Sequence, residues 1–125
     1  MPLYYECDAE KRRVTVLSVG SATLDEVLEV IDRQAADGAW SFGVLYDARL
    51  GGYAPTQDDV RRMVVHVGNV TTRRGPRGPV AFVVADPQLF KMGNWYSQLG
   101  NLTALTVRVF TIIEDAEQWL NDQNA

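Results

Sequence analysis

Hydrophobic positions along the chain recur with two periods, one typical of strands and the other of helices. Short runs rich in valine, leucine and aromatic residues predict five strands, at 3–7, 13–19, 42–47, 80–85 and 105–110. In four other stretches, apolar residues recur every three or four positions. These stretches predict helices at 23–38, at 56–73, from 86 to at least 99, and from 111 towards the polar end at 121–125.

The predicted helices begin with residues that cap helices well. Thr23 and Thr111 each precede a glutamate by three positions, which is the capping-box pattern. Thr56 precedes two aspartates, Asp86 precedes a proline, and Gly38 ends the first helix. The order β-β-α-β-α-β-α-β-α predicts a single α/β domain over 1–125. Its five-stranded sheet is mixed but mostly parallel, opens with an antiparallel hairpin and is flanked by helices.

Three segments support a resemblance to a known family. They are 44–49 at the end of the third strand, 79–84 in the fourth, and 107–110 followed by 114–120. With the opening hairpin and the order of elements, they resemble the STAS fold of sulfate transporters and anti-sigma factor antagonists, and more narrowly the SpoIIAA-like proteins of bacteria. The resemblance implies a non-enzymatic binding or regulatory module that recognises a partner protein.

The phosphorylation switch of the anti-sigma factor antagonists does not transfer to this sequence. Those proteins carry an Asp-Ser pair at the start of the helix after the third strand, whereas here Asp47 is followed by Ala48 and Arg49. Thr56 opens the helix nine residues after Asp47. Phosphorylation of Thr56 is a subsidiary hypothesis, which the neighbouring Asp58 and Asp59 oppose.

The candidate binding surface lies at the carboxyl ends of the parallel strands, where open α/β sheets bind ligands. The loop 48–55 is a candidate lid. Trp95 falls outside the apolar stripe of the third helix, so it is either an exposed anchor or packed against that loop. The candidate binding residues are Asp47, Arg49, Tyr53, Thr56, Phe90, Met92, Trp95 and Tyr96.

Three functions remain open at this stage. The first is recognition of a partner protein through the strand-end loops. The alternative is a carrier or sensor of a small apolar, lipid-like ligand held between the loop 48–55 and the third helix. The lesser alternative is a small enzyme that uses Asp47 or Asp86 as a base. The only histidine, His66, is predicted on a solvated helix face, and the sequence contains no catalytic motif, metal site or cofactor motif.

Charge and cysteine content bear on the partners and the location of the protein. A net charge of −4 argues against nucleic-acid binding. Cys7 is the only cysteine and is predicted to be a buried thiol, and without a signal peptide or membrane span a cytoplasmic location is expected. An exposed first strand would allow a homodimer. Basic residues are expected at the opposite sheet edge, either balancing helix ends or docking to an anionic surface: Lys11, Arg12, Arg13, Arg33, Arg73, Arg74 and Arg77.

Overall fold

The computed structural model describes residues 3–51, 56–85, 91 and 106–123. Apart from Lys91, the predicted third helix lies outside these residues. The elements are β1 (Leu3–Asp8), β2 (Arg13–Gly20), α1 (Leu24–Ala36), β3 (Gly43–Gly51), α2 (Gln57–Arg74), β4 (Val80–Val83), β5 (Val107–Phe110) and α4 (Ile113–Gln123).

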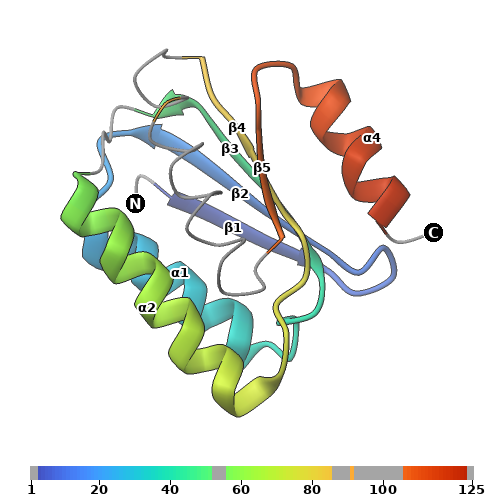
Figure 1. Ribbon diagram of the computed structural model, residues 1–125. Helices are drawn as coiled ribbons and strands as arrows, with labels where there is room; N and C mark the ends of the chain where they lie inside the picture. The colour runs from blue at the N-terminus through green and yellow to red at the C-terminus, as the bar shows by residue number, and fades with distance from the viewer. Residues whose placement is uncertain (1–2, 52–55, 86–90, 92–105, 124–125) are drawn as a thin grey trace.

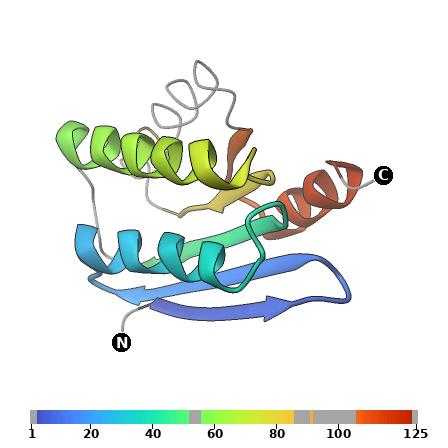
Figure 2. The same cartoon turned by 90° about the horizontal axis from the view of Figure 1, so that it is seen from below.

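The five strands form one sheet in which spatial order equals chain order, β1-β2-β3-β4-β5. β1 pairs with β2 antiparallel, and every later pair is parallel, as predicted. Because the two crossovers through α1 and α2 step across the sheet in the same direction and crossovers are right-handed, both helices lie on the same side. Figures 1 and 2 show α1 and α2 on one side of the sheet and α4 on the other.

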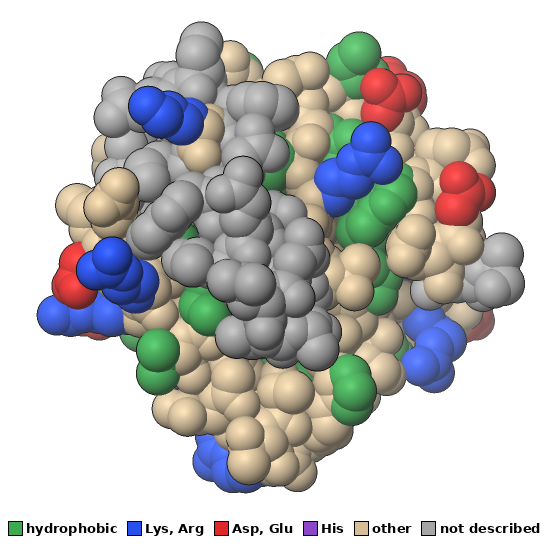
Figure 3. All heavy atoms as spheres, in the orientation of Figure 1, with side chains coloured by type: hydrophobic (Ala, Val, Ile, Leu, Met, Phe, Trp, Pro, Cys, Tyr) green, Lys and Arg blue, Asp and Glu red, His purple; other side chains and the backbone are tan. Residues whose placement is uncertain are grey.

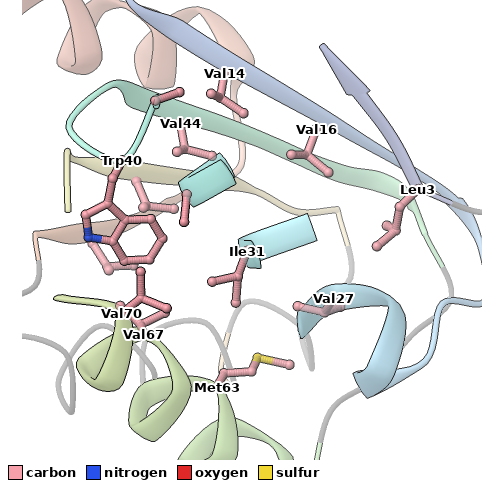
Figure 4. Close-up of a cluster of buried hydrophobic side chains, with 14 of the residues drawn as sticks. Leu3, Val14, Val16, Val27, Ile31, Trp40, Val44, Met63, Val67 and Val70 are labelled. Atoms are coloured by element: carbon pink, nitrogen blue, oxygen red, sulfur yellow. The ribbon is translucent and has the colours of Figure 1, made fainter. Parts of the chain in front are cut away.

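The larger core fills the space between the sheet and the helices α1 and α2 (Figure 4). Alternate residues of β2, among them Val14 and Val16, point into it. Ile31 and Val67 meet them from the two helices, and Trp40 closes one end. The period-two and period-3.6 patterns in the sequence therefore describe the two sides of a single interface.

A smaller core lies on the opposite side of the sheet, under α4. Leu120 is fully buried there against alternate residues of the central strands, including Leu45. The rings of Phe110 and Trp119 are in tilted contact, with centroids 5.8 Å apart and planes at 50°. The Arg108 guanidinium lies 5.1 Å from the Phe110 ring centroid. Figure 3 shows hydrophobic side chains at the surface between β5 and α4. Both sides of β3 are covered, which explains its nearly continuous apolar sequence.

The capping predictions are confirmed for α1 and α2, and the prediction for α4 is wrong. Thr23 and Thr56 each cap their helix through a complete capping box. The prediction for Thr111 is wrong, because α4 begins at Ile113 and the Ile112 carbonyl accepts the first helical hydrogen bond, from the Ala116 amide. Ile113 packs against the smaller core, so tertiary packing overrides the local capping pattern.

The third strand is longer than predicted. It continues past Asp47 to Gly51 because its pairing with β2 resumes after an irregularity in register, with Val19 opposite Leu50. Residues 48–51 of the predicted lid are therefore strand, and residues 52–55 lie outside the described part of the chain.

The prediction of a buried thiol is wrong, since Cys7 is exposed. Leu3 and Tyr5 lie on the same side of β1 and pack into the larger core. Cys7 comes one step further along this edge strand, and Tyr5 already lies beside Asp37, the residue that caps the C-terminal end of α1. The thiol therefore lies past the end of the helix that covers its neighbours.

Candidate binding site at the strand ends

An ion pair between Asp47 and Arg49 lies in the C-terminal half of β3. Asp47 is buried, with 9% of its surface exposed. Its Oδ1 accepts hydrogen bonds from the Arg49 backbone amide at 3.1 Å and from Arg49 Nε at 3.0 Å, while Oδ2 accepts one from Nη2 at 2.8 Å. This is the two-pronged geometry in which a guanidinium binds a carboxylate most strongly. Residues two apart on a strand share a side, so the spacing permits the pair.

The electrostatics of the pair follow from these hydrogen bonds. Side-chain hydrogen bonds from Arg49 lower the pKa of Asp47, although burial acts in the opposite direction. The same bonds raise the pKa of Arg49, and the carboxylates of Glu114 and Glu117 on α4 add to that effect. Arg49 thus lies among three carboxylates, with 40% of its side chain exposed.

Three exposed apolar side chains accompany the ion pair at this edge. Between Leu17–Asp47 and Val19–Leu50, β2 advances by two residues and β3 by three, so the irregularity is a bulge in β3. Beyond it, Val19 and Leu50 are direct cross-strand partners that are 41% and 66% exposed. Ile112, just before α4, is 53% exposed. We call Val19, Asp47, Arg49, Leu50 and Ile112 the strand-end surface.

Thr56 has a structural task of its own. Its hydroxyl accepts the Asp59 amide at 3.1 Å, and Asp59 Oδ2 accepts the Thr56 amide at 3.2 Å. α2 lies on the side of the sheet opposite α4, whereas Asp47 points towards the α4 side with Leu45. The structure therefore unites two of the predicted site residues, Asp47 and Arg49, and places Thr56 at a helix start on the other side. The remaining predicted residues lie outside the described chain and stay predictions: Tyr53, Phe90, Met92, Trp95 and Tyr96.

The sequence predicted that His66 lies on a solvated helix face, but the structure places its side chain against Asp32. His66 Nε2 lies 2.7 Å from Asp32 Oδ1, which links α2 to α1. Within the described ranges, no group of three or more His, Cys, Asp or Glu side chains could hold a metal ion. Asp47 is a poor general base, because its pKa is lowered and both of its oxygens accept hydrogen bonds from Arg49. Asp86, the other base considered, lies outside the described residues.

Several of the basic residues at the opposite edge are engaged in packing. Arg77 lies over the Trp40 ring and donates two hydrogen bonds to the buried Gln34 side chain, at 3.0 and 2.7 Å. Arg33 lies over Tyr5, and Arg12 lies over Phe42. A hollow of about 610 Å³ between the C-terminal ends of α1 and α2 is lined in part by Arg73 and Arg74. Binding of an anionic surface there stays a prediction.

The sequence did not predict the apolar residues of the strand-end surface, Val19, Leu50 and Ile112. The sequence predicted Val19 as the last residue of a strand and Leu50 as part of a loop. The exposure of both side chains was not predicted, because it depends on the bulge and on where α4 ends. Alternation along β2 offered one signal, since Leu17 and Val19 share a side, and the buried Val14 and Val16 occupy the other. The Asp47–Arg49 spacing was a second signal.

These features define the architecture: an antiparallel hairpin, parallel strands in chain order, two helices on one side of the sheet and α4 on the other. The chain has the SpoIIAA-like fold. No family model matches the sequence, and no curated protein matches it either. Among the helices that the structure describes, none qualifies as a candidate membrane span.

Two solved structures are similar to it. One is an uncharacterized protein of the DUF3478 family with a SpoIIAA-like fold, from Shewanella loihica. It is 14% identical with a TM-score of 0.61, and the match covers 94% of this chain and 91% of that one. The other is the anti-sigma factor antagonist SpoIIAA in its unphosphorylated form. It is 10% identical with a TM-score of 0.56, and the match covers 95% of this chain and 97% of that one. Identities this low establish the shared fold alone.

Proposed function

We propose that this chain is a regulatory binding module that recognises a partner protein through the strand-end surface. The observation that supports the proposal is the exposure of Val19, Leu50 and Ile112 around the Asp47–Arg49 pair. Protein interfaces combine an apolar centre with a few well-oriented polar groups, and arginine is enriched among the residues that dominate binding.

The ion pair gives this surface a fixed orientation. Asp47 holds the Arg49 guanidinium through two side-chain hydrogen bonds, so little side-chain freedom is lost when a partner binds it. The exposed part of Arg49 suits a carboxylate or a carbonyl group of the partner. The adjacent Leu50 supplies apolar area to the same contact.

The similarity to SpoIIAA supports this class of function. That protein is an anti-sigma factor antagonist, which is a regulatory role. We extend the regulatory role to this chain as a proposal. Since Ala48 and Arg49 follow Asp47, we do not extend phosphorylation at that position.

Substitution of the exposed leucine tests the proposal. Wild-type protein and two variants, Leu50→Glu and Val65→Glu, would be used to capture proteins from an extract of the source cells. Val65 is a matched control, because it is 61% exposed in α2 and lies outside the strand-end surface. The captured protein would then be purified and its Kd for each variant measured by calorimetry.

We expect Leu50→Glu to weaken binding at least about tenfold, because it places a charge in a desolvated contact. Val65→Glu should leave the Kd within about twofold of the wild-type value. Equal effects of the two substitutions, or no effect of Leu50→Glu on any purified partner, would refute the strand-end proposal.

A further inference from the structure

Among the residues that the structure describes, helices cover the hairpin half of the sheet on only one side. β2 shows the difference within a single strand: Val14 and Val16 are buried under the helices α1 and α2, whereas Thr15 and Leu17 on the opposite side are only half-buried. Tyr4, the cross-strand partner of Leu17, is 57% exposed. α4 packs mainly on β3, β4 and β5, and it meets the hairpin through the hydrogen bond from Arg13 to Asn121.

The space beside α4 is a groove of about 620 Å³. Thr15 and Leu45 form part of its lining from neighbouring strands. Residues of β1 border one long side and residues of α4 the other, while the hairpin closes one end, where Arg13 Nη2 donates to Asn121 Oδ1 at 3.0 Å. Adjacent strands are about 4.8 Å apart, so β1 and β2 leave a strip roughly as wide as one helix, about 10 Å. The residues that line the groove are Glu6, Asp8, Lys11, Arg13, Thr15, Leu45, Glu117 and Asn121.

Both long sides of the groove are acidic. Glu6 and Asp8 face it from β1, and Glu117 faces it from α4. α4 contains no lysine, arginine or histidine. Its four carboxylates belong to Glu114, Asp115, Glu117 and Asp122. The cations Lys11 and Arg13 lie at the hairpin end only. The charge pattern therefore fits a basic occupant that lies parallel to α4.

We propose that this groove binds an amphipathic helix of a partner protein, with an apolar stripe flanked by lysine or arginine. The stripe would cover Thr15, Leu17 and Tyr4, and the flanking cations would meet Glu6 and Glu117. Such a helix would lie beside α4 and complete the helical layer on this side of the sheet. The groove adjoins the strand-end surface at Glu117, whose carboxylate also acts on Arg49. The proposal is argued from the lining of the groove and not from the proposed function.

A displayed library of helical peptides of about 16 residues, about 24 Å long, tests the proposal. The library would be selected against the wild-type protein, and Kd values of recovered peptides would be measured for two variants. Glu117→Lys reverses a charge on the groove. Glu29→Lys makes the same chemical change on an exposed position of α1, on the other side of the sheet. Circular dichroism would establish that both variants are folded.

We expect recovered peptides to be enriched in lysine and arginine beside an apolar stripe of helical period. They should bind Glu117→Lys at least about tenfold more weakly and Glu29→Lys within about twofold of wild type. In ¹⁵N spectra, the bound peptide should shift the amides of Glu6, Thr15 and Glu117.

Three results would overturn the proposal. One is a selection that yields no binders, or only neutral or acidic ones. Another is a peptide that binds Glu117→Lys and Glu29→Lys equally or that shifts amides elsewhere. The third is self-association in sedimentation velocity that Glu117→Lys abolishes, because the groove's occupant would then be a second copy of this chain.

Discussion

Truncation of Leu120 is the sharpest test of how α4 is held. Leu120 is fully buried, and α4 attaches to the sheet through this residue, Ala116 and the partly buried Ile113 and Trp119. Leu120→Ala removes three carbon atoms, worth about 2.4 kcal/mol at about 0.8 kcal/mol each. The cavity left behind adds to this, so we expect a total loss of about 3–4 kcal/mol in the free energy of unfolding.

Leu50→Ala is the matched control, because it makes the same chemical change at a side chain that is 66% exposed. It should change the free energy of unfolding by less than about 0.5 kcal/mol. Urea unfolding followed by circular dichroism measures both. With an m-value of about 1.5 kcal/mol/M, Leu120→Ala should lower the midpoint by about 2 M and leave the slope unchanged.

A second substitution, Gly43→Ala, tests whether Leu120 packs against β3. A Cβ atom on Gly43 would lie 3.4 Å from Leu120 Cδ2, so Gly43→Ala places a methyl group beside the space that Leu120→Ala opens. The double variant should recover about 0.5–1 kcal/mol relative to Leu120→Ala. Similar losses for Leu120→Ala and Leu50→Ala would refute the assignment of α4 to a buried interface.

Four further predictions concern single positions. Asp47→Asn should destabilise the protein more at about pH 7 than at about pH 3, as measured by urea unfolding. The pKa of Asp47 is lowered in the folded protein, so its contribution is present above the pKa of an unfolded aspartate, about 3.9, and is lost as the pH falls through the lower folded value; a difference independent of pH would contradict the role of Arg49. Gly68→Ala should raise the free energy of unfolding by about 0.5–1 kcal/mol, because Gly68 lies in α2 and an added Cβ atom meets nothing within 4 Å. Gly78→Ala should lower it by more than about 2 kcal/mol, because the added carbon would collide with the Ser41 and Phe42 carbonyls; equal thermal stability of the two alanine variants would count against this packing. Finally, Cys7 should react fully with a thiol reagent in the native protein, one thiol per chain, whereas a thiol released only by denaturant would indicate burial.

The sequence predicted the architecture well because its local signals and its packing agree. Val14 and Val16 alternate with more polar residues in β2, and Ile31 belongs to a helical stripe, so period alone identified the residues of the larger core. Thr23 and Thr56 were recognisable because a capping box is complete within four residues. Thr111 misled because the start of α4 depends on where Ile113 packs against the sheet.

The candidate site was predicted less completely, for reasons that lie in three-dimensional contacts. Strand-end placement of Asp47 and Arg49 followed from topology, and the pairing of the two side chains was implicit in their spacing. The exposure of Leu50 depends on a bulge that extends β3, and the exposure of Cys7 depends on where α1 ends. Neither the bulge nor the position of a helix end above a neighbouring strand can be predicted from the residue types at those positions.

The agreement between chain order and spatial order in the sheet has a consequence for synthesis. Each strand from β2 onwards joins the strand that preceded it in the sequence, so no place in the sheet is kept open for a later segment. The hairpin of β1 and β2 can form first as the chain leaves the ribosome, and each further strand then adds to an existing template. A nascent chain of this topology exposes only one growing edge to aggregation at any moment, and α4 seals the final strands last.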